Sequence, residues 1–401
     1  MKNKVMPVLL AISLSAAGVM PTSSVFAANN TEASIQNYKK TVIDKSAEIV
    51  DHIANTGNAV YSPTSLNYAL GMLMEGAKGE AHEELIKFYG PELQENLKAY
   101  IRCIENYNIE SEEKSKLEIA DAVWVDQSLG LKEEYKKAVE DGYQASVESL
   151  DFEDAEGTSK RINEWCKEKT EGLIPEIITP DSITPDTGLC LTNSIYFESA
   201  WSGDPWNVSE EKEAFGEDEE TNYMVSSGDT YYENNQAIAF GRSSNNGLQF
   251  VGILPKEKGE FTLENLDIYS LLKSTPEYDD VKCKMPKLNI ETSASLTDIL
   301  NEMGLDNIFS SDADFSGISD QPTHVGSILQ KTKLELDENG TRAAAVTAIM
   351  VETMAMPPAD PVIKEVDLNR PFAFLIYDSV NEEVLFIGKI VSLENFSCAF
   401  S

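Results

Sequence analysis

Histidine, cysteine and long apolar runs are scarce in this chain. Its 401 residues include three His and five Cys. The Gly-x-Ser-x-Gly, His-Glu-x-x-His and phosphate-binding glycine motifs of common enzymes do not occur in the sequence. Three scattered imidazoles offer little from which to build a catalytic triad. We therefore expect a protein that is not an enzyme and that uses neither a cofactor nor a metal.

The cysteines are odd in number and form no Cys-x-x-Cys pair, which argues against a disulfide framework and against a zinc site. We expect free or buried thiols, with a single bridge in an oxidising compartment as the alternative. The five positions are Cys103, Cys166, Cys190, Cys283 and Cys398.

Positive charge is also scarce, since 32 Lys and Arg face 68 Asp and Glu, for a formal net charge of −36. Such a charge repels nucleic-acid backbones, anionic membranes and heparin-like polyanions. We expect none of these as partners. The acidic residues themselves are interpreted as a solvated surface.

The first 27 residues have the pattern of a secretory signal. Lys2 and Lys4 precede an apolar run from Val5 to Met20, and in Val25-Phe26-Ala27 the small residues Val25 and Ala27 precede a cleavage site. The apolar run is short for a membrane span. Because no linker or repeat divides the remainder, we expect residues 1–27 to be a signal peptide and residues 28–401 to form one domain, secreted to the extracellular space as a monomer.

The most informative stretch runs from residue 334 to residue 358. Leu334 and Leu336 alternate with polar residues, which indicates a strand, and the following Asp-Glu-Asn-Gly indicates a turn. Residues 343–356 contain no Gly or Pro, so a short amphipathic helix is one interpretation. The other is a strand, in which alternate positions would present one face of small side chains that could enter a packed sheet without overpacking. That face would consist of Thr341, Ala343, Ala345 and Thr347.

This stretch resembles the hinge and reactive-centre loop of the serpins, protein inhibitors of proteases that act by loop insertion. In their hinge, Glu, Gly, Thr and a run of Ala precede a further Thr. The resemblance implies an α+β fold of about nine helices around three β-sheets, with an exposed reactive-centre loop at about residues 338–361. The matching hinge positions are Glu338, Gly340, Thr341, Ala343, Ala344, Ala345 and Thr347.

Other segments resemble serpin motifs in the same order. They imply a cluster beneath the main sheet, the shutter, with Ser62, Ser65, Asn193 and Gln330. Gln330 stands where the family has His; its amide can still donate and accept, but a pH dependence should be lost. They also imply a breach, where the loop enters the sheet, with Trp201 and with Lys287 pairing the hinge Glu338. A pair of this kind is worth about 0–1 kcal/mol.

The same comparison sets expectations for the elements. The helix and loop of residues 91–118 are acidic where glycosaminoglycan-activated serpins are basic, so we expect no heparin site. Gly172 should end a helix. A further helix is expected over residues 33–55, and strands over residues 122–125, 191–201, 248–255, 285–290, 369–376 and 385–390.

The implied activity is that of a suicide substrate, in which the cleaved loop inserts into the main sheet and traps the protease as an acyl-enzyme. Counting sixteen residues from Glu338, as in the family, places the scissile bond at Met354-Ala355, with Thr353 or Met356 as alternative scissile residues. An apolar residue there suits elastase-, subtilisin- or chymotrypsin-like serine proteases, and a cysteine protease is a further candidate.

The competing hypothesis is a non-inhibitory serpin that acts as a carrier, chaperone or storage protein. Such proteins tend to break the hinge with Pro, charge or bulk. Here the single charged hinge residue is Arg342, which in a strand would face away from the small residues. The sequence therefore favours inhibition.

Overall fold

The computed structural model describes residues 22–54, 56–110, 116–183, 187–341, 361–393 and 397–398. The chain divides into two units, residues 1–37 and 38–401, and every strand belongs to the second. Several predicted positions lie outside the described residues: Ala343, Ala344, Ala345 and Thr347 of the hinge, the scissile pair Met354-Ala355, and the alternatives Thr353 and Met356.

The described residues contain eight α-helices. The second begins at a hydroxyl cap, because Ser62 is its N-cap, the Ser62 hydroxyl accepts from the Ser65 amide, and Pro63 occupies the first turn. The first helix begins at Thr22 rather than at residue 33. The helices are α1 (Thr22–Ile53), α2 (Pro63–Gly76), α3 (Gly79–Tyr89), α4 (Leu93–Glu110), α5 (Glu133–Tyr143), α6 (Ala155–Lys169), α7 (Ile268–Leu272) and α8 (Thr297–Glu302).

The described strands form three large sheets and a two-stranded ribbon, so the expected α+β class is confirmed. In spatial order, the seven-stranded main sheet consists of β19 (Ser397–Cys398), β13 (Leu288–Ser295), β14 (Val325–Asp337), β15 (Gly340–Thr341), β4 (Leu189–Ala200), β2 (Lys116–Asp126) and β3 (Ser146–Leu150). The six-stranded sheet consists of β1 (Ala59–Tyr61), β18 (Glu383–Ile390), β17 (Phe372–Asp378), β11 (Gln249–Pro255), β10 (Ala237–Ser243) and β9 (Thr230–Glu233). The four-stranded sheet consists of β16 (Ile363–Asp367), β12 (Asp280–Pro286), β8 (Tyr223–Ser227) and β5 (Asn207–Val208), and β6 (Glu213–Phe215) pairs with β7 (Glu219–Thr221).

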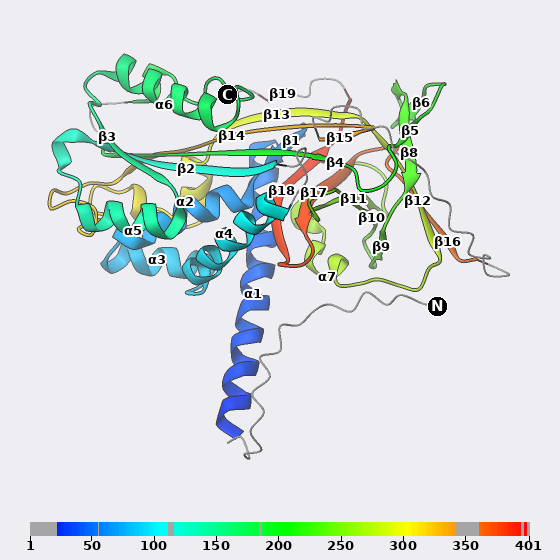
Figure 1. Ribbon diagram of the computed structural model, residues 1–401, viewed down its shortest axis with the longest axis horizontal. Helices are drawn as coiled ribbons and strands as arrows, with labels where there is room; N and C mark the ends of the chain where they lie inside the picture. Colours follow the sequence, from blue (N-terminus) through cyan, green and yellow to red (C-terminus); the bar gives the residue numbers. More distant parts are fainter. Residues whose placement is uncertain are drawn as a thin grey trace. The chain divides into compact units, whose positions relative to one another are not determined.

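Helices cover both faces of the main sheet. α2 lies against one face, where it contacts β2, β4 and also β18 of the six-stranded sheet, and α6 lies on the other face (Figure 1). On the α6 side, the rings of Trp124 and Trp165 meet edge to face, with centroids 5.5 Å apart. The α2 side is continuous with the main hydrophobic core, so alternate residues of β2 and β4 point into the protein interior.

Two predicted elements differ from the structure. The strand expected over residues 285–290 is two strands in different sheets: β12 ends at Pro286, β13 begins at Leu288, and Lys287 lies at the junction. Pro286 has no N–H with which to continue a ladder, which fits a change of sheet at this point. The helix and loop expected over residues 91–118 end earlier, because β2 already begins at Lys116.

The end of α6 and the state of the cysteines can also be compared with the sequence predictions. Gly172 has φ +81°, and its amide donates to the Lys167 carbonyl, so the chain turns away just after α6 as predicted. Among the residues described, Cys103, Cys166, Cys190 and Cys283 are free thiols. The last three are buried.

Candidate functional site

The hinge begins inside the main sheet. β15 lies between β14 and β4 and pairs with both: Gly340 is opposite Ala200 on β4, and Thr341 is opposite Ser199. Gly340 has φ +139°, and a Cβ there would lie 2.2 Å from the Ser199 carbonyl oxygen. The entry point therefore accepts glycine alone, because any side chain would collide with the neighbouring backbone.

Further along, the same two neighbours close on each other. β4 and β14 pair directly and in parallel from Leu189 to Asn193 and from Val325 to Gln330. We call this stretch the closed seam. The main sheet thus has one end occupied by the start of the loop and another end where the two flanking strands are joined.

The shutter residues form two separate contacts at the end of the closed seam that is nearer to the hinge. Gln330 Oε1 accepts from the Ser62 amide at 2.8 Å, and Gln330 Nε2 donates to the Ser62 carbonyl at 3.0 Å. Gln330 therefore ties β14 to the N-terminus of α2 with both ends of one amide. Ser65 contributes its backbone amide to the Ser62 hydroxyl at 3.3 Å.

Asn193, which is opposite Gln330, turns instead to Asp121 on β2. Asn193 Nδ2 donates to Asp121 Oδ1 at 2.6 Å. Both side chains are buried, and Asp121 Oδ2 and Asn193 Oδ1 find no hydrogen-bond partner among the described residues. Burial raises the pKa of Asp121 to about 8, although the Asn193 amide partly offsets this shift. Burial of this carboxyl therefore favours its protonated form.

Asp121 was not anticipated from the sequence. A signal was present, because this single acid interrupts an otherwise apolar run from Ile119 to Val125. A buried strand position with a carboxylate is rare unless it is paired or functional.

At the other end of β4, the breach residues surround the hinge turn. Lys287 forms an ion pair with Glu338, and this contact lowers the pKa of the Glu338 carboxyl. Both side chains are partly exposed, so the pair adds little to stability. Trp201 is 5% exposed and packs on Trp206, with ring centroids 5.5 Å apart.

The segment from Trp201 to Trp206, here called the clasp, binds three successive hinge carbonyls. Trp201 Nε1 donates to the Asp337 carbonyl at 2.9 Å. The Trp206 amide donates to the Glu338 carbonyl at 2.9 Å, and the Trp201 amide donates to the Asn339 carbonyl at 3.1 Å. The hinge turn is thereby held by main-chain and indole donors, in addition to the ion pair.

Other chemistry is not apparent in the parts of the chain that the structure describes. Within those ranges, His, Cys, Asp and Glu form no group of three or more that could hold a metal ion. Within the same ranges, the helices are too short or too polar to cross a membrane. The candidate site is therefore the hinge, the closed seam and the groups that hold them.

The chain is similar to known proteins over nearly its whole length. Residues 37–393 match the family model described as Serpin (serine protease inhibitor). An uncharacterised serpin-like protein of Methanosarcina acetivorans is 32% identical over 379 residues, which cover 91% of this chain and 87% of the relative. Alpha-1-antiproteinase 2 of Equus caballus is 30% identical over 360 residues, which cover 85% of this chain and 83% of the relative.

A solved structure agrees at the level of the fold. Human thyroxine-binding globulin, in complex with thyroxine, superposes with a TM-score of 0.74 at 20% identity, over 90% of this chain and 99% of that chain. Sequence, family model and three-sheet architecture coincide over nearly the whole length, and the chain belongs to the serpin family.

Proposed function

We propose that the protein inhibits proteases as a suicide substrate, with its loop inserting between β4 and β14. The observation that carries this proposal is the position of β15: Gly340 and Thr341 already pair with both strands between which an inserted loop would lie. The first residues of the new strand are thus in place before any cleavage.

The register of β15 also supports insertion of the residues that follow. Continued antiparallel to β4, it would bring Ala343 opposite Phe197 and Thr347 opposite Asn193. Continued along β14, it would bring Thr347 opposite Gln330, so both registers agree on the same position. The small residues at 341, 343, 345 and 347 would then share the buried face of Asn193, while Arg342 would point to the other face.

The length of the gap fits the expected scissile bond. In the same register, Val351 would reach Leu189, the first residue of β4. The strand would therefore be complete three residues before Met354. An inserted segment from Thr341 to about Thr353 would be about 40 Å long at ~3.3 Å per residue. A protease attached at Met354 would be carried across the sheet.

The chemistry starts as ordinary proteolysis. The protease nucleophile attacks the Met354 carbonyl carbon, the amide bond to Ala355 breaks, and the amine of Ala355 leaves with a proton. The acyl-enzyme remains attached to Met354 while the freed hinge enters the sheet. Inhibition then depends on whether insertion is faster than deacylation, and serpin loop insertion is itself a standard example of such a switch.

Insertion must part the closed seam. The parallel pairing of Leu189–Asn193 with Val325–Gln330 would be lost and replaced by pairing with the loop on both sides. Thr347 would bring its hydroxyl beside Asn193 Oδ1, which lacks a partner among the described residues. The native state is accordingly held by a barrier rather than by being the most stable arrangement.

The target class follows from the residue at the scissile bond. Met354 is apolar and unbranched, and its neighbours Thr353 and Ala355 are small or β-branched. Elastase-, subtilisin- and chymotrypsin-like serine proteases accept such residues, whereas a trypsin-like pocket needs a basic one. Cysteine proteases form the analogous thioester and are a second class of target.

Incubation with elastase tests the proposal. We expect a complex that survives SDS and contains the protease, together with a released fragment that begins at Ala355 by mass spectrometry. A fragment beginning after Thr353 or after Met356 would move the scissile bond but keep the mechanism. Cleavage without any SDS-stable complex would contradict inhibition.

The second candidate function is that of a carrier. It is motivated by the similarity in fold to thyroxine-binding globulin, which was solved with thyroxine. In that case the loop would be dispensable, and elastase would cleave it without being trapped. The same incubation therefore separates the two functions.

Export and domain limits belong to the same proposal. A signal peptide of residues 1–27 would be removed, and the mature protein from Ala28 would be a secreted monomer that meets extracellular proteases. N-terminal sequencing of the protein recovered from the medium tests this, and a first residue other than Ala28 would contradict the cleavage site.

A further inference from the structure

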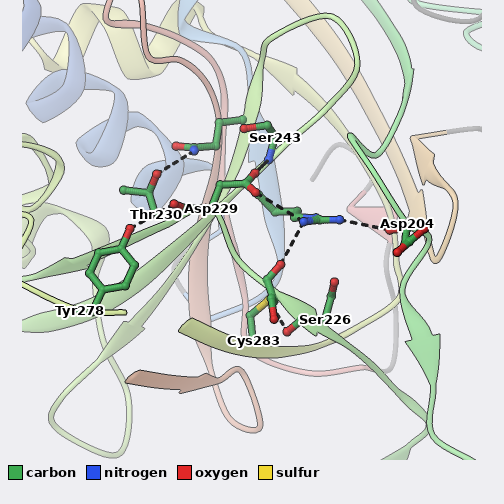
Figure 2. A network of polar contacts seen from close by, with 10 residues as sticks. Asp204, Ser226, Asp229, Thr230, Ser243, Tyr278 and Cys283 are labelled. Carbon is green, nitrogen blue, oxygen red and sulfur yellow. Dashed lines mark hydrogen bonds and ion pairs between the residues drawn. The ribbon is translucent and has the colours of Figure 1, made fainter. Parts of the chain in front are cut away.

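Arg242, the penultimate residue of β10, is a nearly buried cation that joins three segments. Its side chain has a relative exposure of 10%. Nη1 donates to the Ser227 carbonyl at the end of β8 and Nη2 donates to the Asp204 carbonyl, both at 3.1 Å. Nη1 also lies 3.5 Å from Asp229 Oδ1. Figure 2 shows this network, with Asp204 at one edge of it and Tyr278 at the other.

One of these three partners lies in the clasp. Asp204 is in the turn between Trp201 and Trp206, the two residues that bind the hinge carbonyls. The same turn is held next to β10 by the Ser202 amide, which donates to the Ser243 carbonyl at 2.9 Å. Arg242 therefore fixes the turn from one side while the turn holds the hinge from the other.

The balance of charges argues for a geometrical role. In the part of the chain that the structure describes, Arg242 has one carboxylate partner, Asp229 at 3.5 Å, and its Nε has no hydrogen-bond partner. Burial of an incompletely compensated cation is costly, and an apolar side chain could fill the same space at lower cost. An apolar side chain has no hydrogen-bond donors, however, whereas the rigid guanidinium fork donates to two carbonyls on different segments.

We propose that Arg242 is a positioning residue that keeps the clasp shaped for the hinge, so that the loop starts its insertion from a prepared turn. The clasp binds the carbonyls of Asp337, Glu338 and Asn339 while the next residues, in β15, already have the register in which the loop would insert. Loosening the clasp would let the hinge leave the sheet and would delay the first step of insertion. This inference rests on the proposed inhibitory function.

Two matched substitutions test it by hydrogen exchange. Arg242→Gln removes the fork, and Tyr278→Phe removes a different bond of the same network, the one from the Tyr278 hydroxyl to the Asp229 carbonyl. In Arg242→Gln, we expect the amides of Trp201 and Trp206 to exchange about tenfold faster than in wild type, because a charge-assisted bond is lost. In Tyr278→Phe, the same two amides should exchange as in wild type.

The partition between inhibitor and substrate gives a second readout. With elastase, Arg242→Gln should be cleaved at the wild-type rate but should need several times more inhibitor per trapped protease. A general loss of stability would not produce this split, in which cleavage of the loop is unchanged and only its insertion is slowed. Arg242→Lys keeps the charge and the apolar stem, and it should fall between wild type and Arg242→Gln in both measurements.

The outcomes separate the two proposals. If Trp201 and Trp206 exchange in Arg242→Gln as in wild type, or if Tyr278→Phe accelerates them equally, the role of Arg242 is refuted. If Arg242→Gln does not fold, a folded Arg242→Lys with wild-type exchange refutes it as well. If wild type never traps elastase, the inhibitory function fails, and the exchange comparison still decides whether Arg242 holds the clasp.

Discussion

The two ends of the gap between β4 and β14 are built differently. At the hinge end, Gly340 and Thr341 occupy the gap, and the turn before them is held by the clasp and an ion pair. At the other end, β4 and β14 are joined by the closed seam, and Gln330 is bonded to the backbone of Ser62.

This difference separates starting an insertion from completing it. Because two residues are already paired on both sides, the entropy cost of finding the first contact has been met in the native state. The remaining barrier lies where parallel pairs must part and where buried polar groups must exchange partners. Changes at the hinge end should therefore affect the start of insertion, and changes at the closed seam should affect its completion.

The largest expected effect is at the hinge. Thr341→Arg would place a charge on the buried face of the sheet, which costs several kcal/mol unless the side chain can reach solvent. The loop would still be recognised and cleaved, but insertion would lose to deacylation. We expect the variant to be a substrate, measured as cleaved protein without an SDS-stable complex.

Ala344→Arg is the control for that substitution, because residue 344 would point to the opposite face. It should still inhibit. Cleaved wild type should also melt at a much higher temperature than the intact protein, and cleaved Thr341→Arg should gain much less. Trapping by Thr341→Arg at the wild-type stoichiometry would refute insertion of this face.

The closed seam can be locked through a native thiol. Ser327 is opposite Cys190 across the seam, and its hydroxyl lies 3.3 Å from the Cys190 sulfur. Adjacent strands are about 4.8 Å apart, within the range that a disulfide spans. Oxidised Ser327→Cys should therefore be cleaved as a substrate, while the same protein after reduction should trap elastase.

The reduced protein is the built-in control, and Ser327→Cys with Cys190→Ser, which cannot form the bond, should inhibit under both conditions. Stoichiometry of inhibition with and without oxidant measures the effect. If the oxidised, cross-linked variant inhibits as well as the reduced one, the loop does not enter between these strands.

A pH effect of intermediate size is expected from Asp121. Its pKa rises from 3.8 to about 8 on folding, so between these values the native state binds more protons than the unfolded state. The free energy of unfolding should therefore decrease as pH rises through this range. Asp121→Asn, which keeps the bond to Asn193 available, should remove this contribution, as measured by urea unfolding from pH 4 to pH 8.

The comparison is made as a difference between wild type and variant at each pH, because the many other acids contribute equally to both. Tyr68 and Tyr143 line the same cavity as Asp121, and burial raises the pKa of each, so neither titrates below pH 8. Glu168, Lys169 and Glu171 also line it. Parallel pH profiles for the two proteins would show that Asp121 is ionised in the fold.

The smallest effect is expected from the hinge ion pair. Glu338→Gln or Lys287→Met should lower stability by about 1 kcal/mol or less, since both side chains are partly exposed and screened by salt. Because the pair lowers the pKa of Glu338, its contribution to the free energy of unfolding is present at neutral pH. That contribution is lost as pH falls through the lowered pKa of Glu338. Equal effects of both single substitutions and of the double variant would identify the pair as the cause.

Much of the fold followed from local patterns. Ser62 and Pro63 begin α2 because a hydroxyl cap and a fixed φ suit a first turn, and the contact of Lys287 with Glu338 agrees with the family pattern. The strand boundary at Pro286 was missed, although the apolar alternation changes phase there, from Val281, Cys283 and Met285 to Leu288 and Ile290. Periodicity alone does not indicate to which sheet each half belongs.

The missing parts of the site depend on contacts between distant segments. Asp121 and Asn193 are 72 positions apart, and Arg242 and Asp204 are 38 positions apart. Neither pairing has a periodicity or spacing that a single sequence could reveal. The acid within an apolar strand was a visible irregularity, but its partner depends on the register between β2 and β4.

Gly340 also fixes the frame in which the loop is counted. Since a Cβ at this point would meet the Ser199 carbonyl oxygen, a slip that brought Asn339 or Thr341 there is sterically blocked. A one-residue deletion between Gly340 and the scissile bond could not be absorbed at the entry. It would exchange the inward and outward faces for every later residue. Whether the number of residues between Gly340 and the scissile bond is odd or even would then determine which loop side chains face the protein interior. It would thereby determine whether the loop can insert and trap the protease.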